Sequence, residues 1–306
     1  LDSEISISEN AWRKGGAPSG GSAMFAIINS RIKLSDILQG IIVQSGTDAS
    51  TALAEAIAGD EPTFGRIMTE RVRGLGLTKS VFRNATGMPD PQQRVTAREL
   101  ALLADHIIKT YPELYKIFGQ REFTWNKIRQ LNRNSLLEIG IGVDGLKTGH
   151  TEAAGYGEVI SAPNDGRRLI AVLHGLTSMA QRTEEGRKLI TWGARAFERF
   201  AAYPEGAVVA YADVYGGEVP SVGLVGKGEV ALYLPRGSRR CLSAEVAYKG
   251  PLMPPVMEGD KIAELRVYCD DKLVQAAPLY AAQTVRPGDI VRKATDALKQ
   301  LALGWL

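Results

Sequence analysis

Hydrophobic positions in the first part of the chain recur mostly at helical spacing. Apolar side chains lie every three or four residues over 34–58, and Gly59 follows where a helix C-cap is expected. Thr96 precedes another apolar run and Glu99 comes three residues later, which is the spacing of a capping box. The predicted helices cover residues 34–58, 62–77, 97–112 and 181–200.

Strand-like patterns separate these helices. Residues 122–137 form a short strand-like segment, and two apolar runs lie on either side of Asn164-Asp165-Gly166. A short polar turn that contains Asp-Gly between two apolar runs is typical of a β-hairpin. The first part of the chain is therefore predicted to fold as helices packed on an antiparallel sheet.

The hydrophobic pattern changes near residues 201–206. Beyond this point short apolar runs alternate with glycine, proline and charged residues, which is typical of a small all-β sandwich. The last residues are again helical, with an apolar side and a basic side, as in a helix that covers the sandwich or lies on a membrane. Three regions are predicted: a mixed domain over 1–202, a sandwich over 203–288 and an amphipathic helix over 289–306.

Composition narrows the class of protein. The 306 residues are 44% hydrophobic and 23% charged, which is typical of a globular protein. The net charge is only +3 and no run of lysine and arginine stands out, so nucleic-acid binding is not indicated. No sequence window approaches the roughly 18 continuous apolar residues of a membrane-spanning helix.

The cysteines leave two alternatives open. Cys241 and Cys269 lie in separate strand-like runs, without a second pair or a histidine cluster nearby. This pattern does not indicate a metal site. The two residues are expected either to form a disulfide in an oxidising compartment or to be buried free thiols.

One short segment carries unusual chemistry. Lys147-Thr148-Gly149 lies at the start of a predicted strand, with further glycines on either side. A buried lysine is costly and a glycine weakens strand packing, so the segment suggests that another backbone lies against the strand beside a positive charge. By itself, an isolated Lys-Thr-Gly is more often an ordinary surface turn.

Other motifs give this segment its context. Ser45-Gly46-Thr47-Asp48 stands 102 residues before Lys147 (147 minus 45), between an apolar run and a helix. With SENAW, QSGTDAS, NKIRQLNRNSLL, VDGLKTGHTEAAGY and LITWG in this order, the chain resembles the low-molecular-mass penicillin-binding proteins, serine D-alanyl-D-alanine carboxypeptidases of the bacterial cell envelope. The resemblance covers nearly the whole chain.

The resemblance implies a fold, an activity and roles for individual residues. The fold is an α+β transpeptidase domain like that of penicillin-binding proteins and β-lactamases, followed by the sandwich and the amphipathic helix. Ser45 and Lys147 are the implied catalytic residues: Ser45 passes a proton to the departing D-alanine, and Lys147 supplies charge. Thr148 and Gly149 belong to the strand beside which the substrate backbone lies, and Gly149 leaves room for it.

Further substrate-binding residues are implied by position. Arg133 and Arg182 match positions that face the family's cleft, where a guanidinium group pairs with a terminal carboxylate. His150 directly follows Lys-Thr-Gly and is a candidate for substrate contact rather than a base. Thr47 occupies the position of an asparagine in the family, and its hydroxyl makes fewer hydrogen bonds than an amide.

The main departure from the family pattern concerns the nucleophile. The Ser-x-x-Lys motif that supplies it is expected several tens of residues before Ser45, so the matching segment lies at or beyond Leu1. Since the chain does not begin with methionine, a preceding segment is expected to have been removed. Ser30-Arg31-Ile32-Lys33 has the right letters, but it is expected to be a surface turn before a helix and is not assigned.

Two main hypotheses follow. The first is an enzyme that removes the terminal D-alanine from peptidoglycan stem pentapeptides through an acyl-enzyme and is acylated by β-lactam antibiotics. The second is a non-catalytic homologue that kept the peptidoglycan cleft, which the Thr47 substitution favours. A class A β-lactamase ranks below both, because it needs no C-terminal sandwich.

The resemblance also implies a compartment and a set of partners. The expected location is the periplasm, with the C-terminal helix on the inner membrane surface. The partners are stem peptides ending in D-Ala-D-Ala, β-lactams and that surface, without nucleic acid, metal or organic cofactor. In this compartment a Cys241–Cys269 disulfide is chemically permissible.

Overall fold

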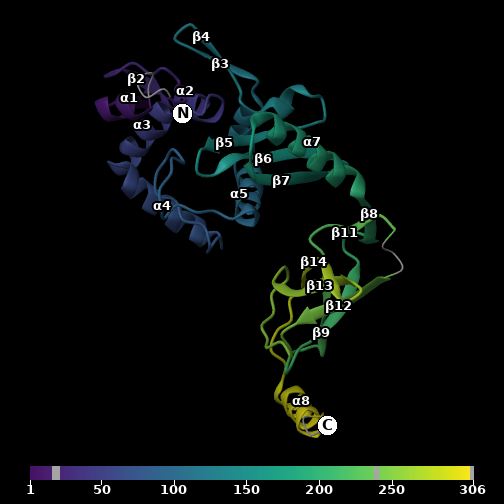
Figure 1. The fold of residues 1–306 in the computed structure, drawn as a ribbon. Coiled ribbons are helices and arrows are strands. Elements are labelled where there is room, and N and C mark those ends of the chain that lie inside the picture. The colour runs from purple at the N-terminus through teal and green to yellow at the C-terminus, as the bar shows by residue number, and fades with distance from the viewer. Residues whose placement is uncertain (16–20, 238–240, 304–306) are drawn as a thin grey trace. The chain divides into compact units, whose positions relative to one another are not determined.

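The computed structural model describes residues 1–15, 21–237 and 241–303, and the chain divides into two compact units, Leu1–Ala194 and Arg195–Leu306. Figure 1 shows helices and small sheets in the first unit, and strands followed by a helix in the second. The predicted fold class, a mixed α+β domain followed by a β-rich domain and a C-terminal helix, is confirmed.

Among its described residues, the first unit contains three small antiparallel sheets and the helices that pack beside them. The sheets pair β1 with β2, β3 with β4, and β5, β6 and β7 in that order. Its elements are α1 (Glu9–Gly15), α2 (Leu34–Ile42), α3 (Thr47–Ala58), α4 (Glu61–Gly74), α5 (Ala97–Thr110), α6 (Pro112–Tyr115), η2 (Lys116–Gly119), η3 (Ser135–Glu138), α7 (Met179–Ala196), β1 (Glu4–Ser6), β2 (Arg31–Lys33), β3 (Glu122–Trp125), β4 (Ile128–Leu131), β5 (Gly145–Thr151), β6 (Gly155–Asn164) and β7 (Arg167–Leu176).

The helix predicted over residues 34–58 is interrupted, which corrects the sequence analysis. Ser45 has a positive φ of 62°, so the chain turns out of α2 and begins again as α3. The amide of Gly46 donates to the carbonyl of Gly40 at 2.9 Å, and a Cβ on Gly46 would lie 3.0 Å from the amide nitrogen of Met24. Apolar periodicity alone does not reveal this break, because residues of both helices belong to one buried cluster.

A buried aspartate fixes the turn between α2 and α3. Asp48 is completely buried, and its carboxylate accepts from the amides of Met24 at 2.9 Å, Ala26 at 3.0 Å and Ala49 at 2.9 Å. A carboxylate at the first turn of a helix is favoured by the unpaired amides and by the helix dipole. Asp48 therefore ties the segment around Met24 to the beginning of α3 and positions the Ser45 turn.

The predicted hairpin is the centre of the main sheet. β6 and β7 are joined by Asp165 and Gly166, whose φ values of 47° and 73° are both positive, as the favoured two-residue hairpin turns require. α7 packs on one face of this sheet, where Ile190 joins a buried cluster with Leu136 and Ile160. The sheet order leaves β5 at the edge.

The predicted cap of α5 is confirmed, with one change. The Thr96 side chain accepts from the amide of Glu99, as in a capping box. Glu99 does not complete the box, because its carboxylate accepts from the amide of Lys79 at 2.9 Å and the hydroxyl of Ser80 at 2.5 Å. Glu99 therefore stabilises the loop that contains Lys79 and Ser80 rather than the N-terminus of α5.

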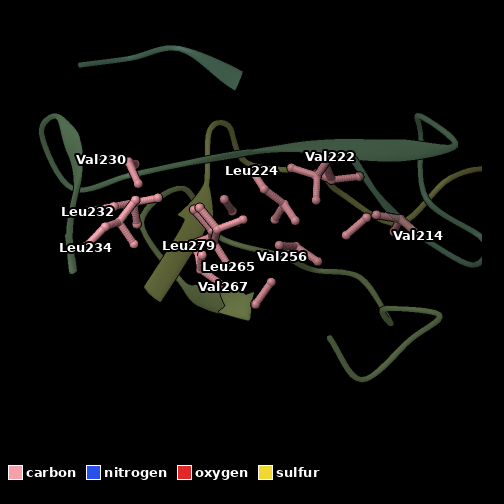
Figure 2. Close-up of a cluster of buried hydrophobic side chains, with 14 residues drawn as sticks. Val214, Val222, Leu224, Val230, Leu232, Leu234, Val256, Leu265, Val267 and Leu279 are labelled. Carbon is pink, nitrogen blue, oxygen red and sulfur yellow. The ribbon is translucent and has the colours of Figure 1, made fainter. Parts of the chain in front are cut away.

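The second unit is built from a five-stranded sheet in the order β12-β13-β14-β10-β9 and a two-stranded sheet of β11 and β8. Figure 2 shows side chains of both sheets meeting in one apolar core, with Leu232 and Leu234 of β11 near Leu265 and Leu279. The elements are β8 (Phe197–Tyr203), β9 (Val208–Asp213), β10 (Ser221–Val225), β11 (Val230–Pro235), β12 (Leu242–Tyr248), β13 (Lys261–Cys269), β14 (Lys272–Ala281) and α8 (Ile290–Leu303).

The helix predicted over 181–200 ends early, which is a second correction. α7 stops at Ala196, and the next residues form β8, in which Phe197 pairs with Pro235 and Phe200 with Leu232. Pairing with β11 outweighs the local helical pattern. Because β8 pairs within the second unit, the division of the chain falls at Ala194, before β8, whereas the sequence placed it after residue 202.

Of the two alternatives for the cysteines, the structure shows the disulfide. Cys241 and Cys269 are bonded at the paired ends of β12 and β13.

α8 is held to the sandwich by Asp296, whose carboxylate accepts from the amide of Gly216 at 2.9 Å.

Replacement of Asp48 by alanine tests the anchoring of the Ser45 turn. We expect a loss of about 2–4 kcal/mol in the free energy of unfolding, because three buried amides lose their acceptor. Amide exchange in a peptide spanning Met24 and Ala26 is expected to accelerate. Asp105→Ala is the control, since its carboxylate makes a surface pair with Lys109 at 2.7 Å and such pairs contribute under about 1 kcal/mol. Equal effects of the two substitutions would contradict this role.

Candidate functional site

Two motifs 102 residues apart meet in the first unit. The ammonium group of Lys147 on β5 donates to the hydroxyl of Ser45 at 2.8 Å and to the carbonyl of Thr148 at 3.0 Å. Ser45 is half-buried and has the positive φ noted above. Non-glycine residues in this region of φ are strained, and such strain is concentrated at functional sites. The arrangement can pass a proton between a lysine and a serine.

The electrostatic environment prepares Lys147 for proton transfer. Burial, together with the positive charges of Arg133 and Arg182, lowers the pKa of Lys147 to about 8. A pKa near the working pH is suited to general acid–base chemistry, because both protonation states are accessible. The same three cations make the site favourable for an anion.

The β5 edge beside Lys147 is open. Side chains alternate along a strand, so Gly149 lies on the same face as Lys147, whereas Thr148 faces the opposite side and is 8% exposed. A Cβ on Gly149 would meet no atom within 4 Å. The absent side chain therefore leaves space beside the Ser45–Lys147 contact, at a strand edge with free backbone hydrogen-bonding groups.

The two arginines differ in their surroundings. Arg133 is exposed, and its Nε donates to the carbonyl of Gln44 at 3.1 Å, directly before Ser45. Arg182 is only 4% exposed, and one of its terminal nitrogens donates to the carbonyl of Arg133 at 3.0 Å. Arg182 thus lies beneath the site and supports the segment that carries Arg133, which is a different position from that of an exposed carboxylate ligand.

Glu158 was missed by the sequence analysis. It lies on β6 opposite Thr148, is 2% exposed, and one carboxylate oxygen lies 3.8 Å from Nε of Arg182. Burial raises the pKa of Glu158 to about 7, and Arg182 opposes this shift. A glutamate in an apolar strand run is the signal that sequence offered, but only the fold shows that an arginine 24 residues further along the chain (182 minus 158) reaches it.

His150 is set apart from this group of charges. It is exposed, and its ring stacks on Tyr156 with the centroids 3.9 Å apart. Tyr156 pairs with His150 across β5 and β6. The histidine therefore flanks the open strand edge without a carboxylate partner among the described interactions.

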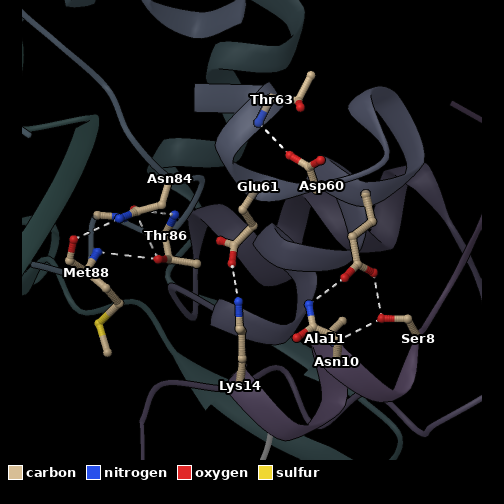
Figure 3. Close-up of polar contacts among 12 residues, drawn as sticks. Ser8, Asn10, Ala11, Lys14, Asp60, Glu61, Thr63, Asn84, Thr86 and Met88 are labelled. Carbon is tan, nitrogen blue, oxygen red and sulfur yellow. Dashed lines mark hydrogen bonds and ion pairs between the residues drawn. The ribbon is translucent and has the colours of Figure 1, made fainter. Parts of the chain in front are cut away.

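Thr47 lies at the beginning of α3, and its amide donates to the carbonyl of Ser22 at 2.9 Å. It also lines a cavity of about 360 Å³ together with Thr51, Glu61 and Arg83. Figure 3 shows polar contacts around this cavity, among them Lys14 with Glu61 at 3.5 Å. The structure brings Ser45 and Lys147 into contact and places Thr47 against this neighbouring cavity.

The alternative Ser-x-x-Lys motif lies elsewhere. The Ser30 hydroxyl donates to the carbonyl of Ile27 at 2.6 Å in a turn, and Lys33 is exposed at the end of β2. The expected helix follows, since α2 begins at Leu34, but Arg31–Lys33 form the short strand β2 and only Ser30 lies at a turn. Neither residue makes a described contact with Ser45 or Lys147.

A lysine–serine contact at an open strand edge, within this two-domain fold, defines the class of penicillin-binding serine peptidases. Residues 1–177 match the family model of D-alanyl-D-alanine carboxypeptidase, and residues 197–287 match that of the C-terminal domain of penicillin-binding protein 5. The chain belongs to the D-alanyl-D-alanine carboxypeptidase family.

Individual relatives agree over nearly the whole chain. It is 37% identical to D-alanyl-D-alanine carboxypeptidase DacA of Haemophilus influenzae, covering 96% of this chain and 75% of that protein. It is 36% identical to DacC of Escherichia coli, covering 100% of this chain and 77% of that protein. The crystal structure of penicillin-binding protein 5 from Haemophilus influenzae superimposes with a TM-score of 0.78 at 36% identity, over 92% of this chain and 83% of that one.

The lowered pKa of Lys147 is open to direct measurement. NMR titration of the lysine side chains is expected to give an apparent pKa of about 8 for Lys147. In an Arg133→Ala variant the value is expected to rise, because a positive charge that disfavours the ammonium form has been removed. Lys188 is the internal control, since its ion pair with Glu185 raises its pKa. Titration of Lys147 together with the exposed lysines would contradict the assigned environment.

Proposed function

We propose that this chain provides the substrate cleft and proton relay of a D-alanyl-D-alanine carboxypeptidase that releases the terminal D-alanine from peptidoglycan stem pentapeptides. The observation that carries the proposal is the Lys147–Ser45 contact at the open edge of β5. The names of the relatives support the substrate class, since they are D-alanyl-D-alanine carboxypeptidases.

Substrate binding follows from the exposed edge of β5. An acyl-D-Ala-D-Ala segment is extended and adds to this edge through backbone hydrogen bonds, with its bulk accommodated at Gly149. Its terminal carboxylate is attracted by the cluster of Lys147, Arg133 and Arg182. This charge selects a free C-terminus over an internal peptide.

The chemistry is acyl transfer to a serine and then to water. A serine hydroxyl attacks the carbonyl between the two D-alanines, the C–N bond breaks, and the departing nitrogen takes a proton delivered through Ser45 from Lys147. The proton released by the attacking hydroxyl restores the ammonium form of Lys147. Water then hydrolyses the ester. We propose that the attacking serine is neither Ser45 nor Ser30, because Ser45 is committed to Lys147 and Ser30 lies in a turn.

A second candidate function is peptidoglycan binding without catalysis. Thr47 favours it, because a short hydroxyl replaces the amide that the family carries at this position and lines a cavity beside the site. The enzymatic proposal is preferred, because a binding cleft has no need for a lysine whose pKa is brought near neutrality.

The proposed location is the periplasm, at the surface of the inner membrane. Within the described part of the chain, no helix is long and apolar enough to cross a membrane. α8 exposes Ile290 at 83%, Val291 at 70% and Leu298 at 68%, whereas its Asp296 side is bound to the sandwich. An apolar face opposite a docked face supports surface binding.

Acylation of the full-length protein by benzylpenicillin tests the proposed reaction. We expect one penicilloyl adduct in the intact-mass spectrum, and a loss of about 10²-fold or more in acylation rate for Lys147→Ala, which is the typical contribution of proton transfer. Lys188→Ala is the control, because Lys188 is an exposed residue of α7 that pairs with Glu185. Acylation of the Lys147 variant at the wild-type rate would refute its role, and no adduct on the wild type would favour the binding protein.

Cosedimentation with anionic phospholipid vesicles tests the membrane surface. Leu298→Glu is expected to lower the affinity about tenfold, because burying a leucine in the bilayer interface contributes about 1.5–3 kcal/mol. Leu273→Glu is the matched control, since Leu273 is 55% exposed on β14 of the sandwich. Equal binding of the two variants would show that α8 does not contact the membrane.

A further inference from the structure

The ion pair between Glu158 and Arg182 is unusual in being deeply buried yet poorly satisfied. The side chains are 1% and 5% exposed, and the closest oxygen and nitrogen are 3.8 Å apart. Both oxygens of Glu158 and Nε of Arg182 lack a hydrogen bond. A buried pair that only stabilises the fold is expected to have close contacts and additional hydrogen bonds, because the cost of removing the charges from water must be offset.

The surroundings of Glu158 make a charge there unnecessary for packing. Its neighbour on β6, Ile160, faces the same side of the sheet and belongs to an apolar cluster with Leu136 and Ile190. On the neighbouring strand β7, Leu173 pairs with Glu158 and packs against the same cluster. An apolar residue would fill this position at a lower cost. The presence of a carboxylate here is therefore explained by its electrostatic effect on Arg182.

Arg182 connects the pair to the candidate site through a series of contacts. It donates to the carbonyl of Arg133 at 3.0 Å, and Nε of Arg133 donates to the carbonyl of Gln44 at 3.1 Å, one residue before Ser45. Arg182 is also close enough to lower the pKa of Lys147. A change in the charge or position of Arg182 is therefore felt at both Ser45 and Lys147.

We propose that Glu158 is a positioning residue for Arg182, and that the carboxylate of a bound substrate competes with Glu158 for the positive charge of this arginine. The proposal rests on the proposed function, since it concerns the D-Ala-D-Ala terminus of the same substrate. It makes Glu158 a determinant of specificity, because its negative charge weakens binding of carboxylates while leaving uncharged peptide ends unaffected.

Protonation of Glu158 affects this competition. Burial raises the pKa of Glu158 to about 7, so its charge is lost as the pH falls through neutrality. Protonation of Glu158 leaves the positive charge of Arg182 unopposed, so a carboxylate in the site is attracted more strongly, and a bound anion in turn raises the pKa of Glu158 further. Carboxylate ligands therefore bind more tightly below pH 7 than above it, with uptake of part of a proton.

Other charged groups around Glu158 are distributed over the elements that pack against it. α7 contributes Arg182, and β5 contributes Lys147, which lies on the opposite face of the strand from Thr148. β7 contributes His174, whose pKa is lowered by burial, next to the paired Leu173. Because Arg182 is the charge that acts on Glu158, removal of the Glu158 carboxylate isolates its effect.

The test compares the full-length wild type with Glu158→Gln, which keeps the volume and removes the charge. Calorimetric binding of N-acetyl-D-Ala-D-Ala and of its C-terminal carboxamide is measured at pH 6 and pH 8. In the wild type the carboxylate peptide is expected to bind about five- to tenfold more tightly at pH 6, as a single group with a pKa near 7 allows. In Glu158→Gln this dependence is expected to fall to about twofold, the part that comes from deprotonation of Lys147 with its pKa of about 8, with the carboxamide unaffected in both proteins.

Two further variants separate charge from structure. Glu158→Asp keeps a carboxylate and is expected to retain the pH dependence, whereas Glu185→Gln on the exposed side of α7 is expected to behave as the wild type. Turnover of a peptide ending in D-Ala-D-Ala is followed in parallel, and for Glu158→Gln at pH 8 the KM is expected to fall with little change in kcat.

The outcomes distinguish this inference from the proposed function. A pH dependence that persists undiminished in Glu158→Gln overturns the role of Glu158, even if the enzyme releases D-alanine. A pH dependence that falls to the part contributed by Lys147 supports it, even if no D-alanine is released and the binding-protein hypothesis is right. Absence of peptide binding by the wild type at both pH values overturns both proposals.

Discussion

The contact between the Lys147 ammonium group and the Ser45 hydroxyl is the interaction on which the site depends. A partly buried lysine is retained at the edge of a sheet only when its charge has partners, and here they are one hydroxyl and one backbone carbonyl. Two hydrogen bonds do not replace full hydration, so the pKa of Lys147 falls to about 8. The incomplete solvation of this lysine is therefore also the origin of its capacity to transfer a proton.

The fold supplies the two halves of this contact by different means. Lys147 is fixed by strand pairing, because its partner Val159 belongs to a central strand. Ser45 lies in a turn, which has no ladder of hydrogen bonds to hold it. Two neighbours hold the turn instead. The carboxylate of Asp48 accepts from three backbone amides, and Gly46 allows a close approach of the chain. The strained φ of Ser45 persists because these neighbours determine it.

The sequence predicted the elements with strong local signals and missed those decided by tertiary contacts. The Asp165-Gly166 hairpin and the Thr96 cap are local, and both were found. The break at Ser45 and the early end of α7 depend on the distant Met24 segment and on β11. Proximity of Ser45 to Lys147 followed from family resemblance, since nothing within either motif specifies a contact over 102 residues.

Glu158 shows why the charge of such a site cannot be inferred from its motifs alone. Lys147, Arg133 and Arg182 are all visible in the sequence as positive residues, and together they describe a cleft with a strong attraction for anions. The opposing carboxylate is that of Glu158 on β6, on the face turned away from Lys147. It acts through Arg182, which is itself buried. The strength of the attraction for a carboxylate is thus set beneath the cleft as well as within it.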